Sequence, residues 1–139
     1  MKIQIYVDGS CKGNPGPSGA GVVIFNMEGE VIKEVKKNLG VMTNNMAEYH
    51  SLLVALHEAN NIGALNLEIF TDSDLMANQI NKRWKVKHPH IKPLHKQVML
   101  VLSSFRDFSI TWIPRENNSH ADFLSNEALK TLDGDVILW

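Results

Sequence analysis

The chain has 139 residues, 44% apolar and 21% charged, enough for one hydrophobic core and too few for two, so residues 1–139 are expected to form one domain. No apolar run reaches the roughly 20 residues of a membrane span, and the N-terminus lacks a signal-peptide core, which predicts a cytoplasmic protein without a membrane partner. The single cysteine, Cys11, excludes a disulfide framework and a multi-cysteine zinc site, while a net charge of −1 excludes no class of partner.

Three strands are predicted in the first third of the chain. Residues 2–7 alternate and are rich in β-branched side chains, 19–25 form an apolar run, and 30–39 alternate again after a turn. No helix separates them, so they should form an antiparallel meander. A loop rich in Gly, Pro, Ser and Asn joins the first two strands, and Asp8 is expected to close the first.

The rest of the chain alternates between helices and strands. A helix is predicted over residues 43–60, where Leu52, Leu56 and Ala59 share one face. The later predicted elements are a strand at 65–70, helices at 73–81 and 91–105, a strand at 108–114 and a helix at 120–132. Together they predict an α/β fold: a five-stranded mixed sheet, three antiparallel strands then parallel strands, with helices on both faces.

Four carboxylates fall where such a fold brings element ends to one rim: Asp8, Glu48, Asp72 and Asp122. Three also have a structural explanation, because residues 45–48 and 119–122 read as capping boxes and an acid near a helix start suits the helix dipole. Capping does not explain Asp8 and Asp72 at the ends of apolar strands. Carboxylates brought together repel one another, and a hard cation with oxygen ligands would relieve that repulsion.

Residues 82–96, KRWKVKHPHIKPLHK, form a basic segment that holds six of the 14 Lys and Arg, three of the six His and no acid. A charge run of this kind is often a solvated face. Lysines interleaved with a tryptophan also suit a nucleic-acid backbone. The two interpretations stay open at this point.

Four motifs in order, YVDGSCKGNPGPSGAG, TNNMAEY, FTDSD and WIPRENNSHADFLSNEAL, resemble the signatures of type 1 ribonuclease H over nearly the whole chain. The resemblance implies the ribonuclease H-like fold and endonucleolytic hydrolysis of the RNA strand of RNA–DNA hybrids, leaving 5′-phosphate and 3′-hydroxyl ends. It makes Asp8, Glu48, Asp72 and Asp122 the catalytic ligands of two Mg²⁺ ions, which Mn²⁺ can replace. Two such ions can activate a water and stabilise the leaving oxygen.

The resemblance also implies a substrate-binding set and a protein that acts as a monomer on an RNA–DNA hybrid. Backbone near Cys11 would meet RNA 2′-hydroxyls, asparagines would touch bases, Thr43 would line a DNA-phosphate pocket and Trp84 the DNA channel. The full set is Gly9, Ser10, Cys11, Asn14, Thr43, Asn44, Asn45, Ser73, Trp84, Lys85 and Lys87. Helix capping or turn chemistry is the alternative for the asparagines, and a core position is the alternative for Trp84.

The chain departs from many relatives in two places. Many bacterial relatives carry an extra basic helix between the second and third predicted helices, whereas here the short segment WKVKHPHIKP bridges that gap directly. The chain is therefore a short form of the family, and weaker hybrid binding is expected. The histidine that several relatives carry well before the last aspartate has no clear counterpart. His120 is one candidate for its catalytic role, with Arg115 and Glu116 as rivals and a simple exposed histidine as the alternative.

Other functions remain open on sequence alone. A P-loop nucleotide site is disfavoured, because residues 8–21 lack the motif G-x-x-x-x-G-K-[ST] and a strand rather than a helix follows them. A non-catalytic hybrid-binding module and a DNA-directed two-metal nuclease share the same fold. The apolar tail at residues 133–139 is expected to pack against the sheet, with a contact to a partner as the alternative.

Overall fold

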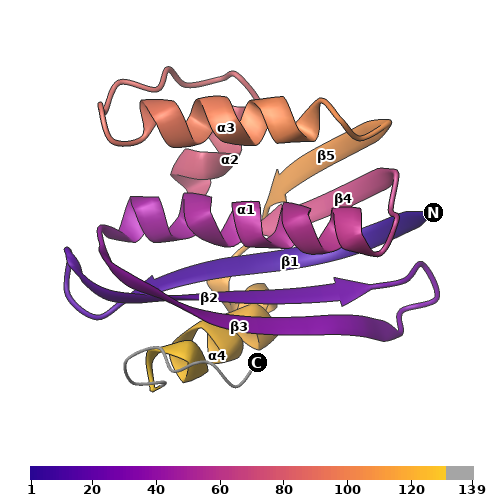
Figure 1. The fold of residues 1–139 in the computed structure, drawn as a ribbon, viewed down its shortest axis with the longest axis horizontal. Helices are drawn as coiled ribbons and strands as arrows, with labels where there is room; N and C mark the ends of the chain where they lie inside the picture. The colour runs from indigo at the N-terminus through magenta and orange to yellow at the C-terminus, as the bar shows by residue number, and fades with distance from the viewer. Residues whose placement is uncertain (131–139) are drawn as a thin grey trace.

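The computed structural model describes residues 1–130 of the chain, which form one five-stranded sheet with helices on both of its faces (Figure 1). The strands are β1 (Lys2–Cys11), β2 (Gly16–Phe25), β3 (Val31–Met42), β4 (Asn66–Thr71) and β5 (Asp107–Trp112). The helices are α1 (Asn44–Asn61), α2 (Asp74–Ile80), α3 (Lys92–Leu102), the short 3₁₀ helix η1 (Arg115–Asn118) and α4 (Ser119–Leu129). Among these described helices, none has the length and apolar content to cross a bilayer.

The sheet has the strand order β3-β2-β1-β4-β5. β1 pairs antiparallel with β2, and β2 with β3, whereas β1–β4 and β4–β5 are parallel pairs. The predicted mixed sheet of three antiparallel strands followed by parallel ones is therefore confirmed. Its central strand, β1, is paired on both sides, which gives a carboxylate on that strand a rigid base.

The helices divide between the two faces of the sheet. In Figure 1, α1, α2 and α3 lie on one face and α4 lies on the other. The larger core lies under the first group, where Ile5, Tyr49, Leu56 and Ile69 are fully buried. A smaller apolar cluster of Val23, Ala121 and Leu124 lies under α4. Apolar burial on both faces thus holds α1 and α4 against opposite sides of β1 and β2.

The strand boundaries near Asp8 differ from the prediction. β1 runs to Cys11 and β2 begins at Gly16, so the predicted long loop shrinks to residues 12–15. The glycines and prolines that indicated a loop continue the hairpin, because pairing across it satisfies their backbone groups. Asp8 therefore lies inside a strand, not at its end, and the prediction was wrong on that point.

Other boundaries follow the prediction within a few residues. α3 starts at Lys92 with Pro93 in its first turn, and no helix fills the connection between α2 and α3, as the short form predicts. α4 starts one residue before the predicted position, and η1 was not predicted. The tail at residues 133–139 lies outside the described residues.

Three strand glycines, Gly9, Gly19 and Gly21, let helices touch the sheet closely. A Cβ atom on Gly9 would lie 2.5 Å from the Ala47 carbonyl of α1, and one on Gly21 would lie 2.1 Å from the Ala121 carbonyl of α4. Both distances are shorter than any real contact, so each helix rests on the bare backbone of a strand. Since Gly21 is the register partner of Asp8, the approach of α4 occurs beside a predicted site residue.

We expect Gly21→Ala to lower the free energy of unfolding by about 2 to 3 kcal/mol, because the new methyl group forces α4 away from β2. Gly63→Ala is the matched control. Gly63 has φ of +78° and nothing within 4 Å of the added carbon, so only backbone strain of about 1 kcal/mol should appear. Urea denaturation measures both variants, and equal losses would contradict the packing argument.

Candidate metal centre and nucleic-acid cleft

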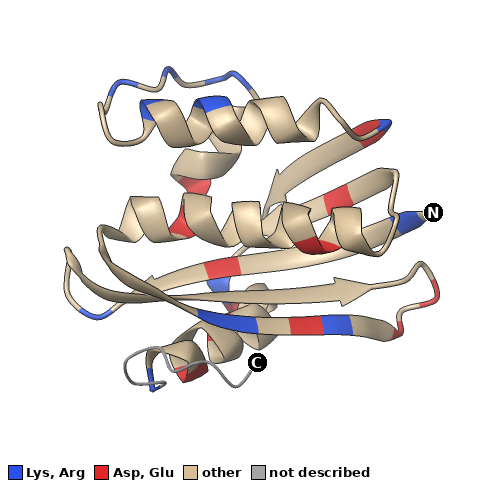
Figure 2. Ribbon diagram, in the orientation of Figure 1, with Lys and Arg blue, Asp and Glu red and all other residues tan. Residues whose placement is uncertain are grey.

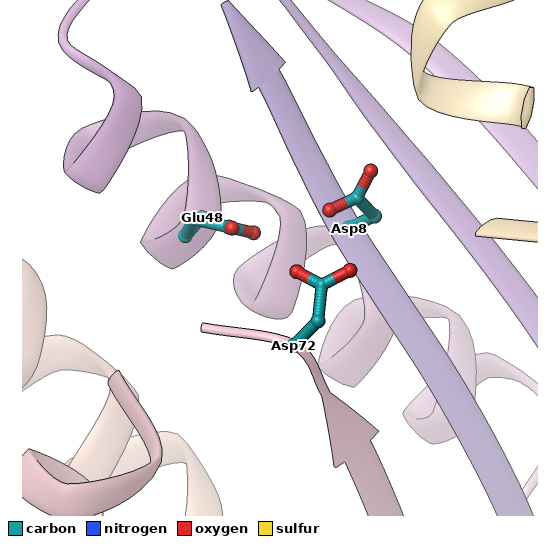
Figure 3. Close-up of side chains that lie close together, drawn as sticks. All are labelled: Asp8, Glu48 and Asp72. Atoms are coloured by element: carbon teal, nitrogen blue, oxygen red, sulfur yellow. The ribbon is translucent and has the colours of Figure 1, made fainter. Parts of the chain in front are cut away.

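Three of the predicted acids meet at one point. Asp8 comes from β1, Glu48 from α1 about one turn after its start, and Asp72 from the residue that follows β4. One oxygen from each carboxylate lies within 4.8 Å of the others, and Figure 3 shows the three groups converging from separate elements. Asp8 is 4% exposed and Glu48 is 5% exposed. The fold therefore brings together carboxylates that are distant in the chain, two of them buried and Asp72 partly exposed.

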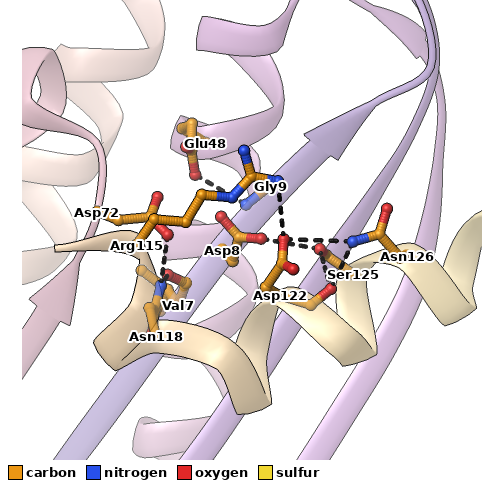
Figure 4. Close-up of polar contacts among 10 residues, drawn as sticks. All are labelled: Val7, Asp8, Gly9, Glu48, Asp72, Arg115, Asn118, Asp122, Ser125 and Asn126. Carbon is orange, nitrogen blue, oxygen red and sulfur yellow. Dashed lines mark hydrogen bonds and ion pairs between the residues drawn. The ribbon is translucent and has the colours of Figure 1, made fainter.

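Each carboxylate of this acid triad accepts a hydrogen bond from a neutral donor (Figure 4). The backbone N–H of Gly9 donates to Glu48 Oε1 over 2.7 Å. The Ser125 hydroxyl lies 2.9 Å from Asp8 Oδ2, and Asn118 Nδ2 lies 3.2 Å from Asp72 Oδ2. These bonds orient the carboxylates without cancelling their charges.

The capping explanation for these acids is wrong in two cases. The side chain that caps α1 belongs to Thr43, which accepts from the Met46 N–H, whereas Glu48 turns to Gly9. No side chain caps the start of α4, so residues 119–122 form no capping box. Only α2 follows the expected pattern, with Ser73 as its cap and Asp74 in its first turn. Glu48 therefore has no role at a helix end that would account for its burial.

Asp122 lies beside the acid triad without belonging to the group within 4.8 Å, and, in addition to their burial, it contributes to the raised pKa of both Asp8 and Glu48. It lines the same cleft, but its Oδ1 lies 3.5 Å from Arg115 Nη2 and 3.2 Å from Asn126 Nδ2. Arg115 is mostly exposed. Asp122 thus has a cationic partner at the edge of the cleft, which the triad carboxylates lack in the described chain.

The electrostatics of the triad follow from its burial. Desolvation, and then the charges of Glu48 and Asp72, raise the pKa of Asp8 from its ordinary value of 3.8 to about 9. Desolvation and the charge of Asp72 raise the pKa of Glu48 from 4.5 to about 8, although the Gly9 N–H and Arg115 oppose the shift. The expected repulsion is present, but burial is the larger cause. Without a cation, the cluster holds protons at neutral pH.

The triad lies at the base of an open cleft of about 520 Å³. The cleft also contains Asp122 and six members of the predicted substrate-binding set: Gly9, Ser10, Cys11, Asn44, Asn45 and Ser73. Asn14 lies at its margin, where its side-chain oxygen accepts from the Asn44 N–H over 2.9 Å. Thr43 immediately precedes Asn44 and caps α1. The structure brings these predicted residues together around the acids.

The remaining predicted contacts lie on the segment between α2 and α3. Figure 2 shows Lys and Arg gathered along this connection, and Trp84 on it is 46% exposed. The core alternative for Trp84 is therefore wrong. Trp84 and Lys85 line a second pocket with Arg83 and His95, separate from the acid cleft. Lys87 follows on the same connection and is exposed.

His120 is not brought to the cleft. Its Nε2 contacts Glu34 of β3, and its side chain lines a different pocket beside Tyr6 and Phe25. His120 and Asp122 are two positions apart on a helix, so they face different directions. Of the two rivals, Arg115 lines the cleft, whereas Glu116 is not among the cleft residues.

Sequence reasoning did not identify Asn118 and Ser125 as part of the site. Both are buried and reach carboxylates 46 and 117 residues away in the chain. Neither residue type is distinctive in a helix, and the partners become visible only when α4 is placed on the sheet. The sequence alone held no signal for either contact.

Comparison with known proteins places the chain among ribonucleases. Residues 6–128 match a family model described as reverse transcriptase-like. The chain is 32% identical to a ribonuclease H of Syntrophus aciditrophicus, over 95% of this chain and 83% of that protein. It is 37% identical to ribonuclease HI of Halobacterium salinarum, over 92% and 64% respectively. A bifunctional protein of Mycobacterium tuberculosis is 41% identical over 93% of the chain, which spans only 36% of that protein's length.

Solved structures agree with this placement. The crystal structure of RNase H1 from Halobacterium salinarum superposes with a TM-score of 0.92 at 36% identity, covering 94% of this chain and 98% of that one. LC11-RNase H1, crystallised in complex with an RNA/DNA hybrid, gives a TM-score of 0.89 at 36% identity over 93% and 97%. With sequence motifs, strand order and acid cluster in agreement across nearly its whole length, the chain belongs to the ribonuclease H family.

Proposed function

We propose that this chain hydrolyses the RNA strand of RNA–DNA hybrids endonucleolytically, leaving 5′-phosphate and 3′-hydroxyl ends. The observation that carries the proposal is the acid triad, in which three carboxylate oxygens from three elements lie within 4.8 Å of one another at the base of an open cleft. Membership of the ribonuclease H family supports the reaction class, and the hybrid bound by LC11-RNase H1 supports the substrate.

The donor set suits a hard divalent cation, because every ligand atom is a carboxylate oxygen and no cysteine or histidine of the described chain joins the group. Asp8, Glu48 and Asp72, with Asp122 nearby, would hold two Mg²⁺ ions, and Mn²⁺ can take the same ligands. Such ions, when bound, supply activation of a water and stabilisation of the departing 3′ oxygen.

The chain's own residues position the substrate. Gly9 is covered by α1, but the next two residues of β1, Ser10 and Cys11, are partly exposed and line the cleft, where their backbone can contact RNA 2′-hydroxyls. Asn44 and Asn45 are exposed at the start of α1 and offer amides to base edges. We assign to Arg115, rather than His120, any assistance at the reacting phosphate, because Arg115 is the one that lines the cleft.

The basic connection between α2 and α3 would add affinity. Its lysines are exposed beside Trp84, which can stack against sugar or base while the lysines neutralise phosphates. No basic helix follows, so the contact area is smaller than in relatives with that helix. Hybrid binding should therefore depend strongly on these few side chains.

Cleavage of labelled hybrid, double-stranded RNA and double-stranded DNA, assayed side by side with Mg²⁺ or Mn²⁺, tests the proposal directly. We expect cleavage of the hybrid alone, within the RNA strand, and none in excess chelator. Binding without cleavage would favour a non-catalytic hybrid-binding module. Cleavage of DNA would favour a DNA-directed nuclease.

We expect Glu48→Gln to raise the Mg²⁺ concentration needed for half-maximal hybrid cleavage by more than about tenfold. The glutamine oxygen can still accept from the Gly9 N–H, so the structural hydrogen bond is kept. In chelator, the melting temperature should hold at pH 7, where burial keeps Glu48 neutral, and should rise at pH 9, where the substitution removes a charge from a crowded cluster. Cleavage against Mg²⁺ concentration and thermal melting are the two measurements.

Asp74→Asn is the matched control for that variant. Asp74 lines the same cleft and its substitution removes the same charge, but it lies outside the acid triad and bonds to Asn78. Its Mg²⁺ dependence should stay close to that of the unmodified protein. If Glu48→Gln behaves like this control, Glu48 is not a metal ligand.

Without metal, the free energy of unfolding should fall as pH rises from 7 to 9. The folded protein keeps protons on Asp8 and Glu48 up to a pKa of about 9 and about 8, whereas the unfolded chain releases them near 4. The folded state therefore binds more protons in this window, and raising the pH favours unfolding. Burial lowers the pKa of His50, so this histidine loses its proton below the window from pH 7 to 9.

Urea denaturation in chelator at pH 7 and pH 9 measures this slope. Asp8→Asn should reduce it, since one of the two titrating carboxyls is gone, and saturating Mg²⁺ should flatten it in the unmodified protein. A metal-free protein whose stability does not change across this window would contradict the electrostatics of the triad.

Replacing Lys85 and Lys87 with Ala should weaken hybrid binding and reduce the slope of log K against log salt by about 2, because each lysine that neutralises a phosphate accounts for roughly one unit of that slope. The control removes Lys2 and Lys33, two cations that pair with Glu68 and Glu58. The control should bind with the slope of the unmodified protein. Equal slopes in both double variants would return the basic connection to the role of a solvated face.

A further inference from the structure

The side chains that support two of the three acids come from a single unit, the continuous pair η1–α4. Asn118, the last residue of η1, contacts Asp72, and Ser125 of α4 contacts Asp8. Both are buried, at 1% and 0% exposure. One rigid piece of chain therefore touches the carboxylates of two different strands, as Figure 4 shows.

Asn118 has no freedom in the way it presents its amide. Nδ2 lies 2.8 Å from the Val7 carbonyl and 3.2 Å from Asp72 Oδ2, so its two protons have one acceptor each. Turning the amide over would put its oxygen against two acceptors. The side chain thus ties β1, one residue before Asp8, to the residue that follows β4.

Ser125 makes a corresponding contact to Asp8. Its Oγ lies 2.9 Å from Asp8 Oδ2 and 2.8 Å from the Asp122 carbonyl, and a hydroxyl has one proton for these two acceptors. A hydrogen bond to an ionised carboxylate is the stronger of the two. The proton therefore goes to Asp8 whenever that carboxylate is charged, as it is when it holds a cation.

Resting on the proposed metal-dependent function, we propose that Asn118 and Ser125 are positioning residues, which set the orientation and spacing of Asp72 and Asp8 for the metal ions. Neutral donors suit this role. A lysine or arginine at either place would neutralise the carboxylate and compete with the cation, whereas an amide or hydroxyl orients it and leaves its charge for the metal. Among the described residues, the side-chain partners of Asp122 are Arg115 at the edge of the cleft and Asn126 of its own helix.

The test is metal affinity in Asn118→Ala and Ser125→Ala. We expect each variant to bind Mn²⁺ about tenfold more weakly by calorimetry and to need about tenfold more Mg²⁺ for half-maximal hybrid cleavage. At saturating metal, the cleavage rate of each variant should come closer to that of the unmodified protein than it does at low metal. A residue that only stabilises the fold would lower the melting temperature and leave both metal dependences unchanged.

Asn117→Ala and Ser119→Ala are the matched controls, since they remove the same side chains from exposed positions of the same unit. Both should keep the metal affinity of the unmodified protein. If Asn118→Ala or Ser125→Ala also keeps it, that residue is not a positioning residue.

A measurement on the unmodified protein covers the case in which Asn118→Ala does not fold. The side-chain amide protons of Asn118, followed by NMR, should exchange slowly with water and shift when Mg²⁺ is added, while those of Asn117 should not. Unmoved Asn118 resonances at a Mg²⁺ concentration that supports cleavage would overturn the proposal. Failure of the unmodified protein to bind Mn²⁺ or to cleave with Mg²⁺ would instead overturn the proposed function.

Discussion

Two helices rest on bare strand backbone, and the candidate site depends on both contacts. α1 meets β1 at Gly9, which brings Glu48 within 2.7 Å of the Gly9 N–H. α4 meets β2 at Gly21, the register partner of Asp8, which brings Ser125 to the Asp8 carboxylate. A side chain at either glycine would separate a helix from the sheet and widen the acid cluster. The spacing of the carboxylates is thus set by sheet–helix packing rather than by a flexible loop.

The same packing creates an electrostatic cost. Asp8 and Glu48 are desolvated and lie close to Asp72, so the pKa values of Asp8 and Glu48 rise. The groups that donate hydrogen bonds to all three carboxylates are neutral. The fold therefore orients negative charge without compensating it. A bound divalent cation would supply the missing charge, which couples metal binding to the stability of the folded protein.

The surfaces that the proposed function assigns to the nucleic acid differ in character. The cleft floor is acidic and is lined by backbone and short polar side chains, whereas the connection between α2 and α3 is basic and exposes Trp84. The two regions suit different parts of one duplex: a scissile phosphate with its cations at the first, and phosphates of the backbone at the second. Net charge near zero conceals this division, which appears only in the distribution of charge.

Periodicity and family motifs are local properties of the chain, so the element order and the mixed sheet could be predicted from the sequence, and the four acids could be singled out as candidates. The prediction that Asp8 ends a strand was wrong. Glycines and prolines indicate a turn unless a partner strand pairs with them, and here β2 pairs with β1 as far as Cys11. Glu48 was open to a capping role until the structure placed Thr43 at the cap. Only the tertiary structure assigned Asn118 and Ser125 to the site, separated His120 from it and paired Asp122 with Arg115. Those contacts join residues distant in the chain, and their existence depends on how closely α4 packs against the sheet.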